Sequence, residues 1–338
     1  MIKKILFVGS IKKGTNSFYT YKVLSEKYNV DIIDIDKFFY PINLIYILLF
    51  YFNFFLPELW FNYKFKKNIN KRYDLIFTLN GEFFGKKILL LLKKRGIRLI
   101  FLCLDNPYFN EDKLKWLIAK KSMHIYDKVI FQQPTRIKYA KKNKLNFSLI
   151  SPIYNKDITR NIKLNFKNRR YKRDVLIIGT WFPERGKLAK DLIKSGINIE
   201  IFGQRWEKDK NYKFIKKYIK HNKPILGHKY FKTIYESKLT ICQPNKENDD
   251  DITNKSIEIP AYGSLLLAKK TKSHDEIFKN YVNAVLFNNS KDLIKKIKKL
   301  IKKDYFINKI SMNGYKKISL DKKFNFKTNL LNIINQLN

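Results

Sequence analysis

Short apolar runs alternate with helix-like segments along most of the chain. In the first half the β-rich runs are Ile5–Val8, Val30–Ile35, Leu75–Leu79, Leu99–Leu104 and Lys128–Phe131. Segments with helical character, such as Phe18–Lys27 and Phe84–Lys94, lie between them, and Gly96 is placed to cap the second. Strands that are apolar throughout are typical of parallel sheets buried on both faces. The pattern therefore predicts a parallel α/β domain at the N-terminus.

The alternation stops at a polar, basic segment, Asn155–Arg173, and then restarts. The second set of expected strands is Asp174–Gly179, Ile197–Phe202, Leu239–Cys242, Ser264–Ala268 and Ala284–Phe287. The expected helices are Glu184–Ser195, Lys229–Glu236, Thr253–Ala261, His274–Phe278 and Lys291–Lys303. A chain of 338 residues is long enough for two domains.

The fold class expected from this pattern is α/β, with two Rossmann-like domains whose parallel sheets face a central cleft. We place the N-terminal domain at residues 1–160 and the C-terminal domain at 161–315. Residues 316–338 are expected to form a C-terminal helix that packs back on the N-terminal domain. Asn155–Arg173 is the predicted linker.

The net charge of +41 has two interpretations. A bias toward Lys, Ile, Asn, Phe and Tyr, as an A/T-rich genome produces, explains it without any function. Attraction to a polyanion, either nucleic acid or an anionic membrane, explains it equally well. The two cysteines, Cys103 and Cys242, both lie in apolar runs and make neither a disulfide framework nor a metal site. They fit a reducing compartment.

Residues Phe38–Pro57 carry no charge over about the length that spans a bilayer. Two prolines, two asparagines and many aromatic residues interrupt the stretch, so we expect helical segments on the rim of one domain that touch the membrane surface. A spanning helix is the alternative, and it would separate the first strand from the rest of the chain. Met1–Gly9 is expected to be a strand and not a secretory signal.

Several common nucleotide and catalytic motifs are missing. Gly9–Thr15 has the glycine spacing of a P-loop but not the lysine that reaches the terminal phosphates, which argues against an ATPase or GTPase. No G-x-G-x-x-G follows a strand, and there is no zinc-type cluster or G-x-S-x-G elbow. His124 and His274 are expected to be structural.

The chemistry is concentrated between Asn248 and Gly263, where a strand leads into a helix. A helix N-terminus offers unsatisfied N–H groups and partial positive charge to a diphosphate. Thr253 is a natural N-cap there, and Lys255 adds a cation. Glu258, one turn further, can accept hydrogen bonds from ribose hydroxyls, and Asp250 in the preceding loop can face a sugar. Clustered carboxylates at Asp249–Asp251 leave a second interpretation open, a divalent-metal site.

This segment resembles the CgeB-like (spore maturation protein) group of GT-B glycosyltransferases, which carry the signature N-x-D-x-x-T-x-R-x-x-E-I-P-A-x-G. The chain matches it at Asn248, Asp250, Thr253, Glu258, Ile259, Pro260, Ala261 and Gly263. Lys255 stands where the family usually has Arg, which keeps the charge but not the planar fork. The Asp-x7-Glu spacing is also similar to the Glu-x7-Glu motif of retaining GT-B enzymes. The resemblance implies that Glu258 binds ribose and that Asp250 contacts the donor sugar.

The resemblance extends to weaker matches. The run from Asp174 through Gly179 to Arg185 is similar to the family's D-x-x-x-x-G-x-x-x-x-x-R, with Arg185 as a second diphosphate cation. Ile201–Trp206 is similar to the next strand–Gly–Trp element. In the first domain, Gly9–Ser17 and Asp105 stand at expected strand ends. The resemblance thus implies catalytic roles for Asp250 and Asp105. It implies donor binding by Glu258, Lys255, Thr253, Arg185, Asn248 and Gly179.

The expected function is transfer of a sugar from a nucleoside diphosphate sugar to a hydroxyl acceptor on a glycan, lipid or protein. We expect it to be independent of metal and cofactor, retaining, cytoplasmic, and peripheral on the inner face of an anionic membrane, as in cell-surface glycan biosynthesis. Nucleic acid is not an expected partner. Two alternatives stay open: a basic α/β protein that binds nucleic acid or membrane without catalysis, and a metal-dependent transferase using Asp249–Asp251.

Overall fold

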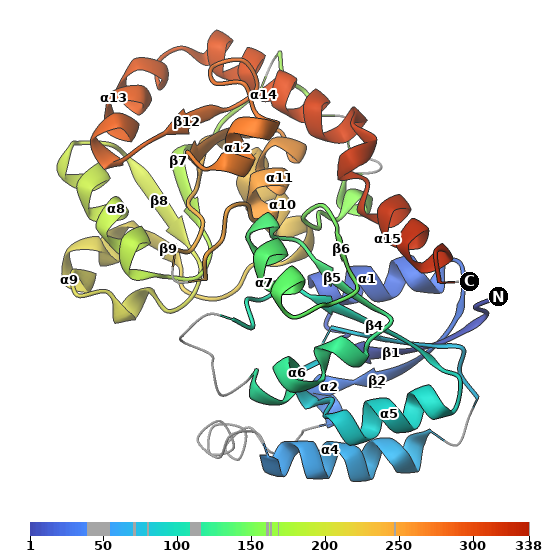
Figure 1. The fold of residues 1–338 in the computed structure, drawn as a ribbon. Helices are drawn as coiled ribbons and strands as arrows, with labels where there is room; N and C mark the ends of the chain where they lie inside the picture. The colour runs from blue at the N-terminus through green and yellow to red at the C-terminus, as the bar shows by residue number, and fades with distance from the viewer. Residues whose placement is uncertain are drawn as a thin grey trace. The chain divides into compact units, whose positions relative to one another are not determined.

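The chain divides into two compact units, each built on its own sheet (Figure 1). The computed structural model describes residues 1–38, 55–69, 72–79, 81–108, 116–159, 162, 164–167, 169–246 and 248–337. The first unit comprises Met1–Ser151, Lys246–Asp250 and Phe326–Asn338, and the second comprises Pro152–Asn245 and Asp251–Asn325. The domain limits expected from the sequence, at residues 160 and 315, remain a prediction.

The first unit contains a six-stranded, fully parallel sheet in the order β2-β1-β3-β4-β5-β6. Its strands are β1 (Lys4–Gly9), β2 (Asn29–Asp34), β3 (Leu75–Thr78), β4 (Arg98–Cys103), β5 (Lys128–Phe131) and β6 (Phe147–Leu149). Its helices are α1 (Asn16–Ser25), α2 (Ile35–Phe38), α4 (Phe55–Asn68), α5 (Lys86–Lys94), α6 (Leu117–Ser122), α7 (Ile137–Lys142) and α15 (Phe326–Asn335).

Both faces of the first sheet are buried, as continuous apolar strands require. Leu6 and Val8 of β1 point into a cluster formed with α4, α5 and α6. Phe7 points the other way, toward Tyr21 of α1. The C-terminal helix α15 lies beside α1 (Figure 1), where Phe326 contacts Tyr19. The last segment of the chain therefore completes the first unit.

The second unit repeats the architecture with the strand order β12-β11-β10-β7-β8-β9, again fully parallel. Its strands are β7 (Arg173–Ile178), β8 (Ile199–Phe202), β9 (Ile219–His221), β10 (Ser237–Cys242), β11 (Leu265–Lys269) and β12 (Val285–Phe287). Its helices are α8 (Pro183–Lys194), α9 (Tyr212–Ile215), α10 (Gly227–Tyr235), α11 (Asn254–Ala261), α12 (Lys272–Ile277), α13 (Ser290–Leu300) and α14 (Asp304–Leu320).

Alternate residues of β7 separate the two cores of this unit. Val175 and Ile177 pack with α8 and α13, whereas Leu176 and Ile178 pack with α10 and α11. Period-two alternation within an all-apolar strand produces this division. The sequence-based prediction of two successive parallel α/β sheets is confirmed.

Of the segment Phe38–Pro57, residues 39–54 lie outside the described residues, and the expectation for it remains a prediction. Within the parts of the chain that the structure describes, no helix has the length and apolar character needed to cross a membrane.

Candidate functional site

The N-terminus of α11 is a well-formed helix cap at the end of β10. Thr253 is the N-cap, with extended backbone (φ −133°, ψ 168°), and forms a capping box with Ser256. The Thr253 N–H donates to Ser256 Oγ at 3.1 Å. This arrangement satisfies one of the orphan donors and leaves the partial positive charge of the helix end in place. The predicted N-cap role of Thr253 agrees with this geometry.

Gly179, at the end of β7, is the point where two predicted cations converge. Its φ is +132°, and a Cβ built there would lie 2.8 Å from Lys255 Cε and 3.1 Å from Arg185 Nη1. A larger residue would displace the end of the Lys255 side chain and press against Arg185, and it would also be strained in this backbone conformation. The glycine therefore keeps a bare stretch of backbone between a lysine and an arginine, a cradle suited to an anion.

Arg185 lies in the first turn of α8 and is only 7% exposed. It donates to the backbone carbonyls of Thr180 and of Gln243, the latter at 3.0 Å. Burial lowers the pKa of its guanidinium from the usual value. Arg185 thus ties the loop after β7 to the loop after β10 and places a cation beside Gly179.

A cavity of about 180 Å³ opens next to this cradle. Its walls come from the ends of β7 and β8, from α10 and from α11, and its lining residues are Ile178, Gly179, Thr180, Phe202, Gly203, Gln204, Pro224, Ile225, Tyr230 and Lys255. The carboxyl ends of parallel strands are where α/β proteins bind ligands. The cavity combines apolar walls with a cation and a positively charged helix end.

Glu258 is positioned by a residue that the sequence did not single out. The hydroxyl of Tyr230, on α10, donates to Glu258 Oε2 at 2.8 Å. Burial raises the pKa of Glu258, against the opposing effects of Tyr230 and Lys255. Tyr230 also lines the cavity. Nothing in the helical pattern of Gly227–Tyr235 distinguishes this tyrosine, because its contact is with a residue 28 positions further along the chain.

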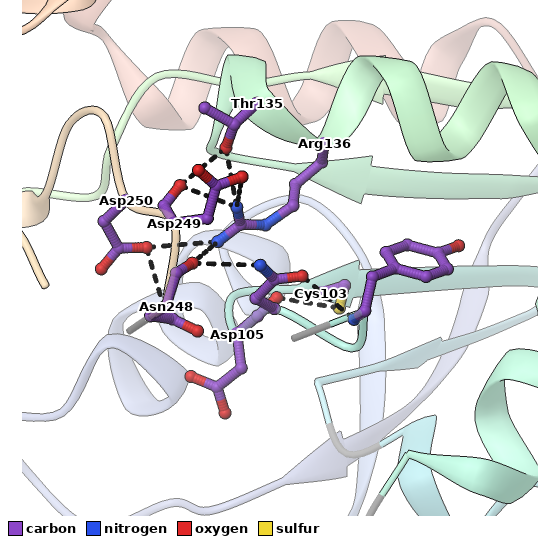
Figure 2. A network of polar contacts seen from close by, with 9 residues as sticks. Cys103, Asp105, Thr135, Arg136, Asn248, Asp249 and Asp250 are labelled. Atoms are coloured by element: carbon purple, nitrogen blue, oxygen red, sulfur yellow. Dashed lines mark hydrogen bonds and ion pairs between the residues drawn. The ribbon is translucent and has the colours of Figure 1, made fainter. Parts of the chain in front are cut away.

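A second polar cluster lies in the first unit, around Arg136 (Figure 2). Arg136 follows β5, and its side chain is 1% exposed. Its guanidinium donates to the backbone carbonyls of Asn248 (2.8 Å) and Asp249 (3.0 Å). It also donates to Asp250 Oδ1 at 3.2 Å. Arg136 therefore holds residues 248–250 at the carboxyl edge of the first sheet. Sequence analysis missed Arg136 because no local sequence pattern signals a contact over such a long separation.

Neighbouring amides complete this cluster. Asn106, at the end of β4, donates from Nδ2 to the carbonyl of Asn248 at 3.1 Å. Asn248 donates from its own amide to Asp250 Oδ1 at 2.8 Å. The predicted residue Asn248 is thus a neighbour of the predicted residue Asp250. In the structure Asn248 orients a carboxylate.

Asp250 has an unusual protonation equilibrium. Burial raises the pKa of its carboxyl to about 6, and the nearby Asp105 contributes in the same direction, although Arg136 and Asn248 oppose the change. A carboxyl with such a pKa exchanges its proton close to neutral pH. Asp105 lies in the loop after β4, and its side chain is exposed. The two predicted catalytic carboxylates therefore belong to one electrostatic cluster.

The three consecutive aspartates do not act as one group. Asp249 (φ +51°) and Asp250 face Arg136, whereas Asp251 accepts hydrogen bonds from the N–H and hydroxyl of Ser273. Among the described residues, no three His, Cys, Asp or Glu side chains are grouped so that they could bind a metal ion.

Comparison with known proteins finds a family match over part of the chain and a shared fold. Residues 185–333 match the family described as glycosyl transferase-like. Sucrose-phosphate synthase from Thermosynechococcus elongatus is similar over 99% of both chains, with 13% identity and a TM-score of 0.65. Anabaena HepE in complex with UDP-glucose is similar over 97% of this chain and 99% of its own, with 13% identity and a TM-score of 0.62.

T4 phage β-glucosyltransferase is similar over 98% of both chains, with 18% identity and a TM-score of 0.61. No curated protein matches the chain in sequence. At these identities the structural likeness establishes the fold, and the chain has the GT-B fold of glycosyltransferases.

Proposed function

We propose that this chain is a glycosyltransferase that moves a sugar from a nucleoside diphosphate sugar to a hydroxyl acceptor. The observation that carries the proposal is the convergence of Lys255 and Arg185 on the bare backbone of Gly179, beside the capped N-terminus of α11. The family match over residues 185–333 supports it, since that span contains α11 and most of the cavity lining.

The proposed donor site is the cavity of the second unit. Its cradle of N–H groups and cations binds the diphosphate, and Thr253 and Lys255 present the helix end to it. Glu258, oriented by Tyr230, accepts hydrogen bonds from the ribose. The solved structures of HepE with UDP-glucose and of the T4 enzyme with UDP make a uridine donor the first to test.

We propose that cationic side chains, and no metal, stabilise the leaving diphosphate. Lys255 and Arg185 supply that charge next to Gly179. The structure of the T4 phage enzyme contains UDP and Mn²⁺, so the experiment must also test the metal-dependent alternative.

The catalytic roles of Asp250 and Asp105 are also proposals. Glycosyl transfer develops positive charge on the sugar ring, which a carboxylate stabilises, and it releases a proton from the acceptor hydroxyl, which a second carboxylate accepts. Retention of configuration, a CgeB-like specificity, a glycan or lipid-linked acceptor and attachment to an anionic membrane are finer proposals. They rest on the Asp250–Glu258 spacing, the signature and the +41 charge.

A thermal-shift panel tests the proposal. Wild type, Glu258→Ala and the control Glu276→Ala, an exposed glutamate on α12, are heated with nucleoside diphosphates, each with Mg²⁺ and with a chelator. A ligand at about 100 times its dissociation constant adds about 2.7 kcal/mol of apparent stability.

We expect a shift in wild type and in Glu276→Ala that the chelator leaves intact, and a smaller shift in Glu258→Ala. A shift that needs Mg²⁺ would favour the metal-dependent rival. Absence of any shift in wild type would overturn the donor site.

A further inference from the structure

His274 lies at the end of a buried hydrogen-bond chain that leads to the start of α11. It belongs to α12 and has no exposed surface. Its Nδ1 is 2.7 Å from the carbonyl oxygen of Lys269, and its Nε2 is 2.7 Å from Ser256 Oγ. Ser256, also fully buried, is the residue that completes the capping box of α11.

The direction of the first bond follows from which atoms can donate. A carbonyl oxygen only accepts, so Nδ1 of His274 carries a proton and donates to Lys269. Nε2 shares its hydrogen bond with the Ser256 hydroxyl, whose oxygen also accepts the Thr253 N–H at 3.1 Å. The chain fixes the rotamer of Ser256 and, through it, the backbone of the helix cap.

The same short helix, α12, binds the loop that precedes α11. The Thr271 hydroxyl donates to the carbonyl of Asp251 at 2.7 Å and accepts the His274 N–H at 3.1 Å. The Ser273 N–H donates to the Asp251 carboxylate at 2.9 Å. Residues 271–274 thus connect α12 to residues 251–256 through several hydrogen bonds.

We infer that His274 is a positioning residue for the donor site: through Ser256 it keeps the first turn of α11 in the geometry that presents its N–H groups and Lys255 to a diphosphate. This inference rests on the proposed function. Preorganised donors matter because a ligand need not supply the cost of ordering them. His274 itself is neither one of the residues that line the cavity nor a near neighbour of Gly179.

Two variants break the same bond from opposite ends. His274→Asn keeps an amide N–H at the position of Nδ1, for the Lys269 carbonyl, and removes the partner of Ser256. Ser256→Ala removes the hydroxyl. The control is Ser264→Ala, another fully buried serine, bonded to Thr240 and Ser237 at the opposite end of α11. The readouts are the dissociation constant for UDP by calorimetry, the melting temperature, and hydrogen exchange of residues 251–258 without ligand.

We expect each variant to weaken UDP binding about tenfold, the effect of one hydrogen bond, and to speed exchange at 251–258. The double variant should bind UDP no more weakly than Ser256→Ala alone, because that substitution already removes the hydroxyl that His274 contacts. Ser264→Ala should lower the melting temperature and leave UDP affinity unchanged.

Unchanged exchange at 251–258, or faster exchange with wild-type UDP affinity, overturns the inference. So does a loss of affinity in Ser264→Ala as large as in His274→Asn, since general loosening would then explain it. Failure of the wild-type chain to bind UDP or any other nucleoside diphosphate is a different result: it overturns the proposed function itself, while the exchange data still report on the hydrogen-bond chain.

Discussion

Arg136 Nη2 lies 3.2 Å from Asp250 Oδ1, although the residues are 114 positions apart in the sequence. The arginine side chain is 1% exposed and the aspartate 13%, so the pair is almost fully removed from water. Buried ion pairs add little stability by themselves, but removal of one partner leaves an unpaired group in a poorly solvated place. The pair is therefore a sensitive probe of how residues 248–250 are placed in the first unit.

Replacement of Arg136 by alanine should destabilise the chain by about 3–5 kcal/mol, because Asp250 and two backbone carbonyls lose their donor. Urea unfolding measures this free energy. The matched control is Arg98→Ala, an exposed arginine at the start of β4, which should stay within about 0.5 kcal/mol of wild type. Equal effects of the two substitutions would contradict the role given to Arg136.

The pKa of Asp250 predicts a specific dependence of stability on pH. Its carboxyl titrates at about 6 in the native state and near 3.8 in an unfolded chain. Between these values the native state binds more protons, so the free energy of unfolding falls as pH rises from about 4 to 6. The decline attributable to this group is at most about 3 kcal/mol.

Asp250→Asn should remove that decline, since the amide does not titrate but can still accept from Arg136. Urea unfolding of both proteins at several pH values between 4 and 7 checks this. Parallel stability curves for wild type and Asp250→Asn would show that Asp250 titrates normally.

Gly179→Ala should weaken nucleotide binding, because the added methyl group enters the space of Lys255 and Arg185. Gly196→Ala is the control: Gly196 has φ +78°, but no atom lies within 4 Å of the place that its new methyl group would take. Gly196→Ala should cost about 1–2 kcal/mol of stability through backbone strain. Gly179→Ala, at φ +132°, should cost about 1–3 kcal/mol for the same reason. Only Gly179→Ala should lower UDP affinity, by about tenfold or more in calorimetry. If Gly179→Ala and Gly196→Ala bind UDP equally well, Gly179 is not part of the donor site.

Tyr230→Phe should leave the fold intact and raise the dissociation constant for UDP several-fold, because Glu258 loses the hydroxyl that orients it. Tyr235→Phe makes the same change on the same helix, at a hydroxyl bonded to Asn165. Titration calorimetry compares the two variants. If Tyr235→Phe weakens binding as much as Tyr230→Phe, the orientation of Glu258 is not the cause.

The strands of this fold were predictable because parallel strands buried on both faces are locally apolar. Lys128–Phe131 has the same limits in the sequence-based prediction and in β5. The short edge strands β6 and β9 were missed because each has only three residues, with at most partial burial. The helix expected over 316–338 overlaps only the last turn of α14, and residues 304–315 of α14 were not predicted as helix because the segment contains Gly314, a poor helix former. A Cβ there would lie 2.6 Å from the carbonyl oxygen of Asn283, so close packing explains the glycine.

The residues of the candidate site also fall into two groups, those that the sequence suggests and those that only the structure reveals. Thr253, Lys255 and Glu258 could be proposed from the sequence because a cap, a cation and a carboxylate follow one another along a single segment. Arg136, Tyr230 and the positioning role of His274 could not, because each acts through a partner that only folding brings near. Local sequence carries the groups proposed to meet the ligand, whereas the residues that hold those groups in place come from distant elements.

Hydrogen exchange of the whole chain, with and without saturating UDP-glucose, tests the central claim most directly because it locates the ligand. We expect slower exchange in the segments that line or adjoin the proposed donor cavity, residues 178–185, 202–204, 224–230 and 253–258. The protection should persist in the presence of a chelator. Two results would contradict the account. One is exchange in all of these segments that neither UDP-glucose nor any other nucleoside diphosphate sugar slows at saturation. The other is protection confined to other parts of the chain.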